Sequence, residues 1–160
     1  MRRDQRLHLV VVAEEKYRAA VEAVPNATFK TDLPWEELEC LFNSASLFAM
    51  PAEYEPWGLV YIEALACRTP ILGLNRNALP EFTQNGKSGF LLNDVTPEAL
   101  AECLLVALSD PDRLAQMGRI GQEHVLRQYT WKAVAERIIS RLFGNAEPRK
   151  LEPNSEVLTH

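Results

Sequence analysis

Residues 47–71 read Leu47-Phe48-Ala49-Met50-Pro51-Ala52-Glu53-Tyr54-Glu55-Pro56-Trp57-Gly58-Leu59-Val60-Tyr61-Ile62-Glu63-Ala64-Leu65-Ala66-Cys67-Arg68-Thr69-Pro70-Ile71. The first four residues form an apolar run that stops at Pro51, which is typical of a buried strand that ends at a proline. After a polar loop, Gly58 opens an apolar, helix-favouring run that lasts to Cys67. The stretch therefore predicts a strand, a loop and a helix. In open α/β sheets, ligands bind where strands end and helices begin.

Two carboxylates bracket this junction. Glu55 lies in the loop, and Glu63 lies about one turn of 3.6 residues past Leu59. Between them, the N–H groups of Gly58, Leu59 and Val60 have no acceptor inside the helix, and a helix start of this kind binds anions, above all phosphate. Gly58 lets a ligand approach its backbone closely. Since carboxylates repel phosphate, the two acids fit better as acceptors for hydroxyls at the two ends of a nucleoside-diphosphate sugar.

Glu55, seven intervening residues and Glu63 resemble the Glu-x7-Glu motif of retaining GT-B glycosyltransferases (glycosyltransferase family 4, "group 1"). A bare Glu-x7-Glu carries no information, but further stretches resemble landmarks of that family in the same order. These are Glu-Ala-Leu-Ala-Cys-Arg-Thr-Pro at 63–70, Leu-Pro-Glu at 79–81, Asn-Gly-Lys-Ser-Gly-Phe-Leu-Leu at 85–92 and Tyr-Thr-Trp at 129–131. The resemblance spans residues 7–143, and its ordered set of motifs is specific.

The resemblance implies a donor-binding role for eight residues. Its candidate catalytic residue is Glu55, whose carboxylate would face the hydroxyls of the donor sugar, while Glu63 would hold the ribose hydroxyls. The other candidates would surround the rest of the donor: Gly58, Leu59 and Val60 at the diphosphate and sugar through their N–H groups, Trp57 and Tyr54 at the sugar, and Thr31 near the base. Core packing is an equal alternative for Trp57. Thr31 lies in Phe-Lys-Thr-Asp at 29–32, where the family usually has Phe-x-Gly-x.

The implied function is donor binding in a retaining, metal-independent glycosyltransferase that transfers a hexose to a sugar or lipid-linked acceptor. The donor would be a UDP-, GDP- or ADP-sugar, and no cofactor is expected. Family members close the donor between two Rossmann-like domains. Neither the N-terminal acceptor domain nor the Gly-Arg…Lys-Gly stretch, whose cations neutralise the diphosphate, is found here. We therefore expect weak donor binding, no turnover by the isolated chain and a partner domain in cis or trans. The chain would be a piece of a longer protein or a split gene product. The alternative is a non-catalytic nucleotide-sugar-binding or interaction module of a split enzyme.

Each chemical motif also has a purely structural or a rival chemical interpretation. Outside the full motif, Glu55 and Glu63 would be read as solvated acids. As a glycosidase acid and nucleophile they would leave the helix start between them unexplained. Asp110-Pro111-Asp112 imitates an Asp-x-Asp metal motif, but its position favours helix capping. Cys67 has no histidine beside it in sequence and is better explained as a buried structural thiol than as a nucleophile.

Length and composition are those of one globular domain: 160 residues, 47% of them hydrophobic and 24% charged. The net charge of −5 argues against nucleic acid as a partner. No apolar run approaches the roughly 20 residues that span a bilayer. The three cysteines are odd in number and widely spaced, which fits buried thiols in a reducing cytoplasm.

The order of elements predicts an α/β fold: a single Rossmann-like, doubly wound parallel sheet of about five strands, as in the C-terminal half of a GT-B enzyme. Strands are expected at 7–13 (buried on both faces), 27–30, 47–50, 69–74 and 90–92, and helices at 14–24, from 34 with Asp32 or Leu33 near the cap, at 59–67 and at 79–84. Arg68 and Asn75-Arg76-Asn77 stand where the family usually has glycine. From Thr96 the chain is helical, with starts after Thr96, Asp110 and Thr130. The domain is expected to cover 1–144, and 145–160 to form a disordered tail.

Overall fold

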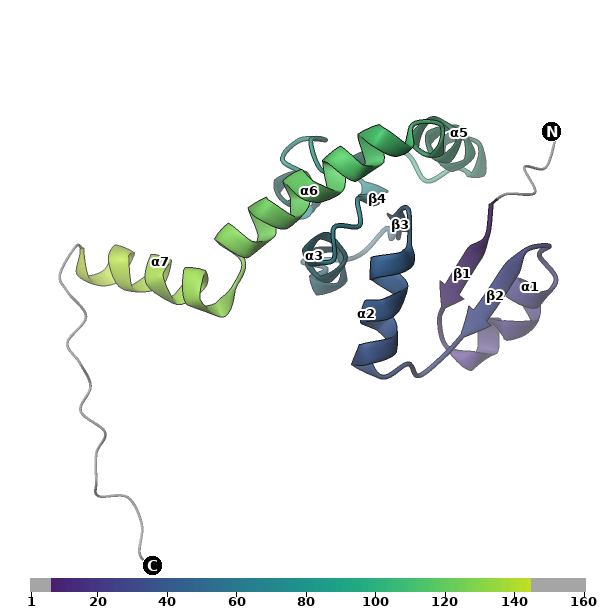
Figure 1. The fold of residues 1–160 in the computed structure, drawn as a ribbon, viewed down its shortest axis with the longest axis horizontal. Helices are drawn as coiled ribbons and strands as arrows, with labels where there is room; N and C mark the ends of the chain where they lie inside the picture. The colour runs from purple at the N-terminus through teal and green to yellow at the C-terminus, as the bar shows by residue number, and fades with distance from the viewer. Residues whose placement is uncertain (1–6, 145–160) are drawn as a thin grey trace, which may run out of the picture.

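The computed structural model describes residues 7–144, in which parallel strands alternate with helices and the last third is helical (Figure 1). The predicted tail lies outside the described residues. The α/β class and the helical C-terminal end are confirmed. The elements in chain order are β1 (Leu9–Val12), the 3-10 turn η1 (Glu15–Tyr17), α1 (Arg18–Glu22), β2 (Ala27–Lys30), α2 (Trp35–Ser44), β3 (Phe48–Ala49), α3 (Leu59–Ala66), β4 (Ile71–Leu74), α4 (Leu79–Phe82), β5 (Gly89–Leu92), α5 (Pro97–Leu108), α6 (Pro111–Gln128) and α7 (Trp131–Phe143).

Strand β4 is the centre of the fold. It pairs in parallel with β3 on one side and β5 on the other, and all four of its residues are buried. Because successive side chains of a strand point to opposite faces, Ile71 joins the core cluster of α3, α4 and α6, whereas Leu72 and Leu74 pack toward α5. The result is a three-layer arrangement in which the continuous apolar run of β4 is buried on both faces.

Strands β1 and β2 form a second parallel ladder, which is not hydrogen-bonded to β3-β4-β5 within residues 7–144. The five strands thus make two ladders where one continuous sheet was expected. The prediction that the strand at 7–13 is buried on both faces is wrong. Val11, the register partner of buried Phe29, is the one partly buried residue of β1, while Leu9, Val10 and Val12 are exposed. Apolar content alone did not reveal that most of β1 lacks a covering layer.

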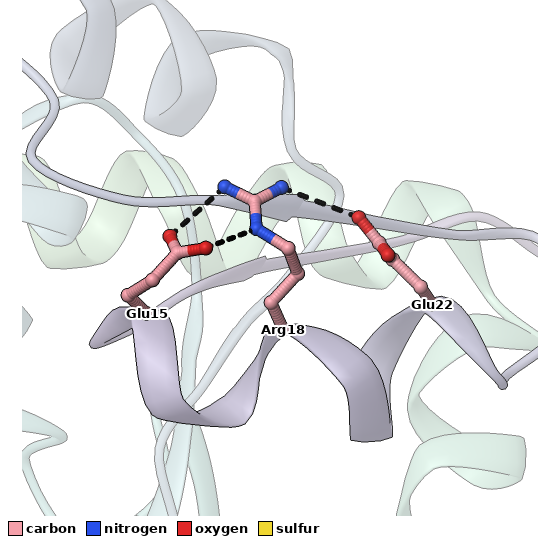
Figure 2. A network of polar contacts seen from close by, with 3 residues as sticks. All are labelled: Glu15, Arg18 and Glu22. Atoms are coloured by element: carbon pink, nitrogen blue, oxygen red, sulfur yellow. Dashed lines mark hydrogen bonds and ion pairs between the residues drawn. The ribbon is translucent and has the colours of Figure 1, made fainter.

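An ion network across η1 and α1 fixes the side chain that covers Phe29 (Figure 2). Arg18 donates from Nε and Nη2 to Glu15 at 2.5 and 2.9 Å and from Nη1 to Glu22 at 3.2 Å. The spacings of three and four residues bring these side chains together on one helix face. The hydrogen bond from Arg18 lowers the pKa of Glu15. Held in this way, the guanidinium lies 4.6 Å from the centroid of the Phe29 ring, so α1 shields β2 with a charged side chain.

Most predicted helix starts are confirmed. The side chains of Thr96, Asp110 and Thr130 accept hydrogen bonds from the backbone N–H three residues later, at 3.1, 2.9 and 3.2 Å. Asp110 therefore caps α6, as its position in the sequence indicated. Helix α2 differs, because its N-cap is Pro34 and no side chain caps it. Leu33 and Asp32 directly precede this cap, as expected, and the helix itself begins at Trp35, one residue after the predicted start.

Helix α6 packs directly on α3 and on the turn that follows it. A Cβ atom at Gly118 would overlap the carbonyl oxygen of Arg68, and one at Gly121 would overlap the side chain of Leu65. Arg68 itself has φ +63°, the left-handed geometry expected from the family's usual glycine, and its Nε donates to Gln122 at 2.7 Å. These close approaches fix the position of α3 against the rest of the fold.

Helix α7 leaves the body of the molecule beyond α6, with Trp131 at its base (Figure 1). Trp131 is 91% exposed and Ile138, Leu142 and Phe143 are exposed as well. Within residues 7–144, no helix combines the length and the apolarity that crossing a membrane requires.

Candidate functional site

The start of α3 offers free backbone donors. Gly58 is the N-cap residue, buried and with φ +77°, a conformation that glycine adopts without strain. Among residues 7–144, no side chain caps α3 and the N–H groups of Gly58, Leu59 and Val60 have no protein acceptor. The first bonded amide is that of Tyr61, which donates to the Gly58 carbonyl at 3.0 Å. Three unpaired donors at the positive end of a helix can bind an anion.

Tyr61 ties this helix start to the end of β3. Its hydroxyl donates to the carbonyl oxygen of Met50, and its ring meets Phe48 edge to face at 5.8 Å. Burial, followed by the charge of Glu55, raises the pKa of Tyr61 to about 12. The phenol therefore stays protonated and keeps donating. Glu55 lies next to the helix start, because its Cγ is 3.1 Å from the position of a Cβ atom at Gly58.

A small pocket lies beside Glu55 where two loops meet. Both loops follow carboxyl ends of neighbouring strands, β3 and β4, as expected for a site in a parallel sheet. Asn77 donates from Nδ2 to the backbone carbonyl of Glu55 at 3.3 Å, with φ +54° in the position where the family has glycine. The pocket is lined by Ala52, Glu55, Trp57, Tyr61, Leu74, Arg76, Asn77 and Leu79. It thus combines one carboxylate, one guanidinium and aromatic walls.

The remaining predicted residues lie outside this pocket. Glu63 is half-buried on α3, one turn beyond Leu59, which is 63% exposed. The helix start therefore lies between Glu55 and Glu63, but the two carboxylates do not share one pocket lining. Tyr54 is 84% exposed, and half-buried Thr31 follows β2 in the other ladder. Their assignments stay predictions.

The cysteines correct one expectation. Cys40 is exposed on α2, and Cys67 and Cys103 are partly exposed, so none is the fully buried thiol that was predicted. The reason is that Cys40 lies on the outer face of its helix, which the sequence alone did not identify. Burial, and then the charges of Glu39 and Glu63, raises the pKa of Cys67. A thiol with a raised pKa is a poor nucleophile, which supports a structural role for Cys67.

Behind the loop lies an aromatic cluster formed by Trp57, Phe82, Tyr129 and His124. Trp57 meets Phe82 edge to face at 5.1 Å, lines the pocket and is 46% exposed. The ring therefore packs on the core, and its role at the sugar stays a prediction. Tyr129 donates to Glu81 at 2.5 Å. The sequence identified the stretches with Glu81 and Tyr129 as landmarks but gave them no partner, and His124 carried no signal at all.

The sequence profile described as "Glycosyl transferases group 1" matches residues 2–124, well over half of the chain. The chain belongs to this family. Among curated members it is 31% identical over 153 residues to a GDP-mannose-dependent monoacylated alpha-(1-6)-phosphatidylinositol monomannoside mannosyltransferase of Corynebacterium glutamicum, covering 88% of the chain and 39% of that enzyme. The Glu-x7-Glu spacing of Glu55 and Glu63 therefore occurs in a chain that belongs to a glycosyltransferase family.

Solved structures show the same fold. Sucrose-phosphate synthase from Thermosynechococcus elongatus superposes with a TM-score of 0.74 at 26% identity, over 87% of the chain and 39% of that structure. HepE of Anabaena, solved in complex with UDP-glucose, gives a TM-score of 0.71 at 18% identity, over 84% of the chain and 40% of that structure. These GT-B relatives support a Rossmann-like C-terminal domain. The chain spans about two fifths of the length of each of these group 1 relatives.

Proposed function

We propose that this chain is the donor-binding domain of a retaining, metal-independent glycosyltransferase that transfers a hexose from a nucleotide-diphosphate sugar to a sugar or lipid-linked acceptor. The amides of Gly58, Leu59 and Val60 bind the diphosphate, Glu55 orients the sugar, and Glu63 accepts hydrogen bonds from the ribose hydroxyls. Trp57 and Tyr54 border the sugar, and Thr31 lies toward the base.

The observation that carries the proposal is the uncapped start of α3, with Glu55 before it and Glu63 one turn inside it. Unpaired donors at a helix start bind an anion without any rearrangement of the protein. The flanking carboxylates disfavour a free polyanion but suit a ligand that presents hydroxyls on either side of its charge. A nucleotide-diphosphate sugar has this arrangement.

Charge explains why a second domain is part of the proposal. A helix N-terminus supplies only about half a positive charge, which does not neutralise a diphosphate beside two carboxylates. Arg76 is the cation that lines the pocket, and we assign it to the phosphate nearer the sugar. The remaining positive charge would come from an N-terminal domain in cis or in trans. The isolated chain would then bind donor weakly and show no turnover.

In the reaction, the charge that grows on the departing diphosphate is stabilised by the preorganised amides of α3 and by cations, without a metal or another cofactor. Glu55 holds the sugar hydroxyls so that the anomeric carbon faces the acceptor side, which is where orientation contributes to rate. The C. glutamicum relative is named for GDP-mannose, and the HepE structure contains UDP-glucose. The donor base of this chain is accordingly proposed only as uridine, guanosine or adenosine.

Ligand-observed NMR against UDP-, GDP- and ADP-glucose and GDP-mannose tests the site. Glu63→Ala should weaken the donor that binds best by roughly tenfold or more, because hydrogen bonds to a charged acceptor contribute about 1.5–3 kcal/mol each. Glu53→Ala is the matched control, since Glu53 is an exposed acid of the same loop and its loss should leave the affinity unchanged.

A second readout uses inorganic pyrophosphate and the backbone amides directly. Pyrophosphate should shift the amide resonances of Leu59 and Val60 in a two-dimensional ¹H–¹⁵N spectrum. The site assignment fails if these resonances do not move, or if Glu63→Ala and Glu53→Ala bind nucleotide sugars equally well.

A second candidate is a non-catalytic nucleotide-sugar-binding module of a split enzyme. The exposed apolar residues of β1, Leu9, Val10 and Val12, favour it, because they would suit contact with a separate chain. Turnover by the chain alone would exclude this candidate. We also propose a cytoplasmic location, since the exposed thiol of Cys40 is compatible with a reducing compartment.

A further inference from the structure

The loop that carries Glu55 contacts the helices behind it through the ring of Trp57. Trp57 meets Phe82 of α4 at a centroid distance of 5.1 Å and an interplanar angle of 89°, and it meets Tyr129 at 6.2 Å and 72°. Phe82 is fully buried and contacts Tyr129 at 5.2 Å and 86°. The three rings therefore contact one another edge to face, a favourable geometry for aromatic pairs. Through them, the loop at 51–58 is braced against α4 and the end of α6.

The loop has little else to hold it. Residues 51–57 form no helix or strand and include Pro51 and Pro56, which lack an N–H donor. Within residues 7–144, the hydrogen bonds of residues 51–57 are one from Ala52 to the Met50 carbonyl at 2.8 Å and one from Asn77 to the Glu55 carbonyl at 3.3 Å. The position of Glu55 consequently depends on where the Trp57 ring lies.

A hydrogen bond orients the ring of Tyr129, which contacts Trp57. Tyr129 is the C-cap residue of α6, and its hydroxyl donates to Oε1 of Glu81 at 2.5 Å, across 48 residues of sequence. On its other side the Tyr129 ring contacts His124 at 5.6 Å. Burial, helped by the bond to Glu81, raises the pKa of Tyr129, so the phenol remains a donor at neutral pH. The bond joins α4 to the end of α6, next to the Trp57 ring of the loop.

We propose that Tyr129 and Glu81 are positioning residues for the donor site: their hydrogen bond orients the Tyr129 ring, which places Trp57 and thereby the carboxylate of Glu55 and the amide of Gly58. This inference rests on the proposed function for its ligand, but the geometry of the loop can be measured without one.

The effect on affinity follows from the population of the correct loop conformation. If loss of the bond leaves one fifth of the molecules with Trp57 in place, the apparent dissociation constant rises about fivefold. Tyr129→Phe keeps the ring and removes only the donor, and Glu81→Ala removes the acceptor. Glu81→Gln retains an acceptor oxygen and should restore most of the wild-type behaviour.

The experiment follows the indole N–H resonance of Trp57 and the dissociation constant for the nucleoside diphosphate that binds best among UDP, GDP and ADP, in the whole chain and at a temperature where every variant is folded. Tyr129→Phe and Glu81→Ala should shift or broaden the Trp57 indole resonance in the same way, weaken binding of that nucleotide about fivefold, and give no further change when combined. Glu81→Gln should resemble the wild type. If Tyr129→Phe fails to fold, Glu81→Ala still decides, because Glu81 is exposed.

Thr69→Val is the matched control. It also removes one hydroxyl donor with a 2.5 Å bond, to the Phe42 carbonyl, but in the core away from the loop. It should lower Tm without moving the Trp57 resonance. The proposal is overturned if Tyr129→Phe and Glu81→Ala likewise lower Tm alone. If the wild type binds none of UDP, GDP and ADP, the proposed donor site fails, while the Trp57 resonance still tests positioning by Tyr129 and Glu81.

Discussion

Replacing Gly58 by alanine tests how tightly the start of α3 is built. Gly58 has φ +77°, and a Cβ atom there would lie 2.5 and 2.8 Å from two ring carbons of Tyr61 and 3.1 Å from Cγ of Glu55. The ring cannot turn aside, because Tyr61 is buried and its hydroxyl is bonded to the Met50 carbonyl. The substitution therefore adds backbone strain and overpacking in one step.

The two costs can be separated. A left-handed conformation costs a non-glycine residue about 1–2 kcal/mol, and overpacking costs about 1–3 kcal/mol. We expect Gly58→Ala to lower the free energy of unfolding by about 2–5 kcal/mol, less a gain of about 0.4–1 kcal/mol from the stiffer unfolded chain. Gly86 is the matched control, since its φ is +92° but a Cβ atom there would meet only the Gly89 carbonyl at 3.9 Å.

Urea unfolding followed by circular dichroism measures both variants, with the m-value checked for constancy. The strain of the left-handed backbone and the gain from the unfolded chain are common to both variants. The difference between their free energies of unfolding should therefore equal the packing cost of about 1–3 kcal/mol. Equal losses for Gly58→Ala and Gly86→Ala would show that the contact with Tyr61 is not tight, and the description of the helix start would then be wrong.

Three further predictions concern stability. Arg68→Gly should be about 1 kcal/mol more stable than Arg68→Ala. Both variants lose the hydrogen bond from Arg68 to Gln122, but only glycine relieves the left-handed φ of +63°. Equal urea midpoints would contradict this. Gly118→Ala should be about 1–2 kcal/mol less stable than Gly121→Ala in the same assay, since the first meets a backbone carbonyl and the second a movable leucine side chain; the reverse order would refute the packing of α6. Finally, burial raises the pKa of Tyr61 to about 12 and also raises that of Tyr129, from an ordinary value of 10.0. The unfolded chain then loses phenolic protons first, so stability should fall as pH rises above 10, less steeply in Tyr61→Phe. Absorbance at the tyrosinate band should show both phenols titrating late.

Local signals predicted the elements well. The bounds of β2 are those expected, and Thr96, Asp110 and Thr130 cap the helices that they were predicted to start. These features depend on neighbours within four residues, which a sequence displays directly. Arg68 and Asn77, which stand where the family usually has glycine, both have left-handed φ values.

Long-range features were not predictable in this way. The exposure of β1 depends on which layer covers it, and β3 is only two residues long because its pairing with β4 is limited to Phe48 with Ile71 and Ala49 with Leu72. For the candidate site, the motif indicated Glu55, Gly58 and the free amides. The bond between Glu81 and Tyr129 joins residues 48 apart in the sequence, and neither local pattern nor spacing identifies such a partner.

The division of the strands into two ladders also bears on how the chain opens. Amides of β4, which is buried and paired on both sides, should exchange with deuterium only when the whole domain unfolds. Those of β1 and β2 should exchange through a smaller, sub-global opening, because no third strand ties this ladder to the others among residues 7–144. The N-terminal ladder would then open and close many times while the strands that carry the Glu55 loop remain folded.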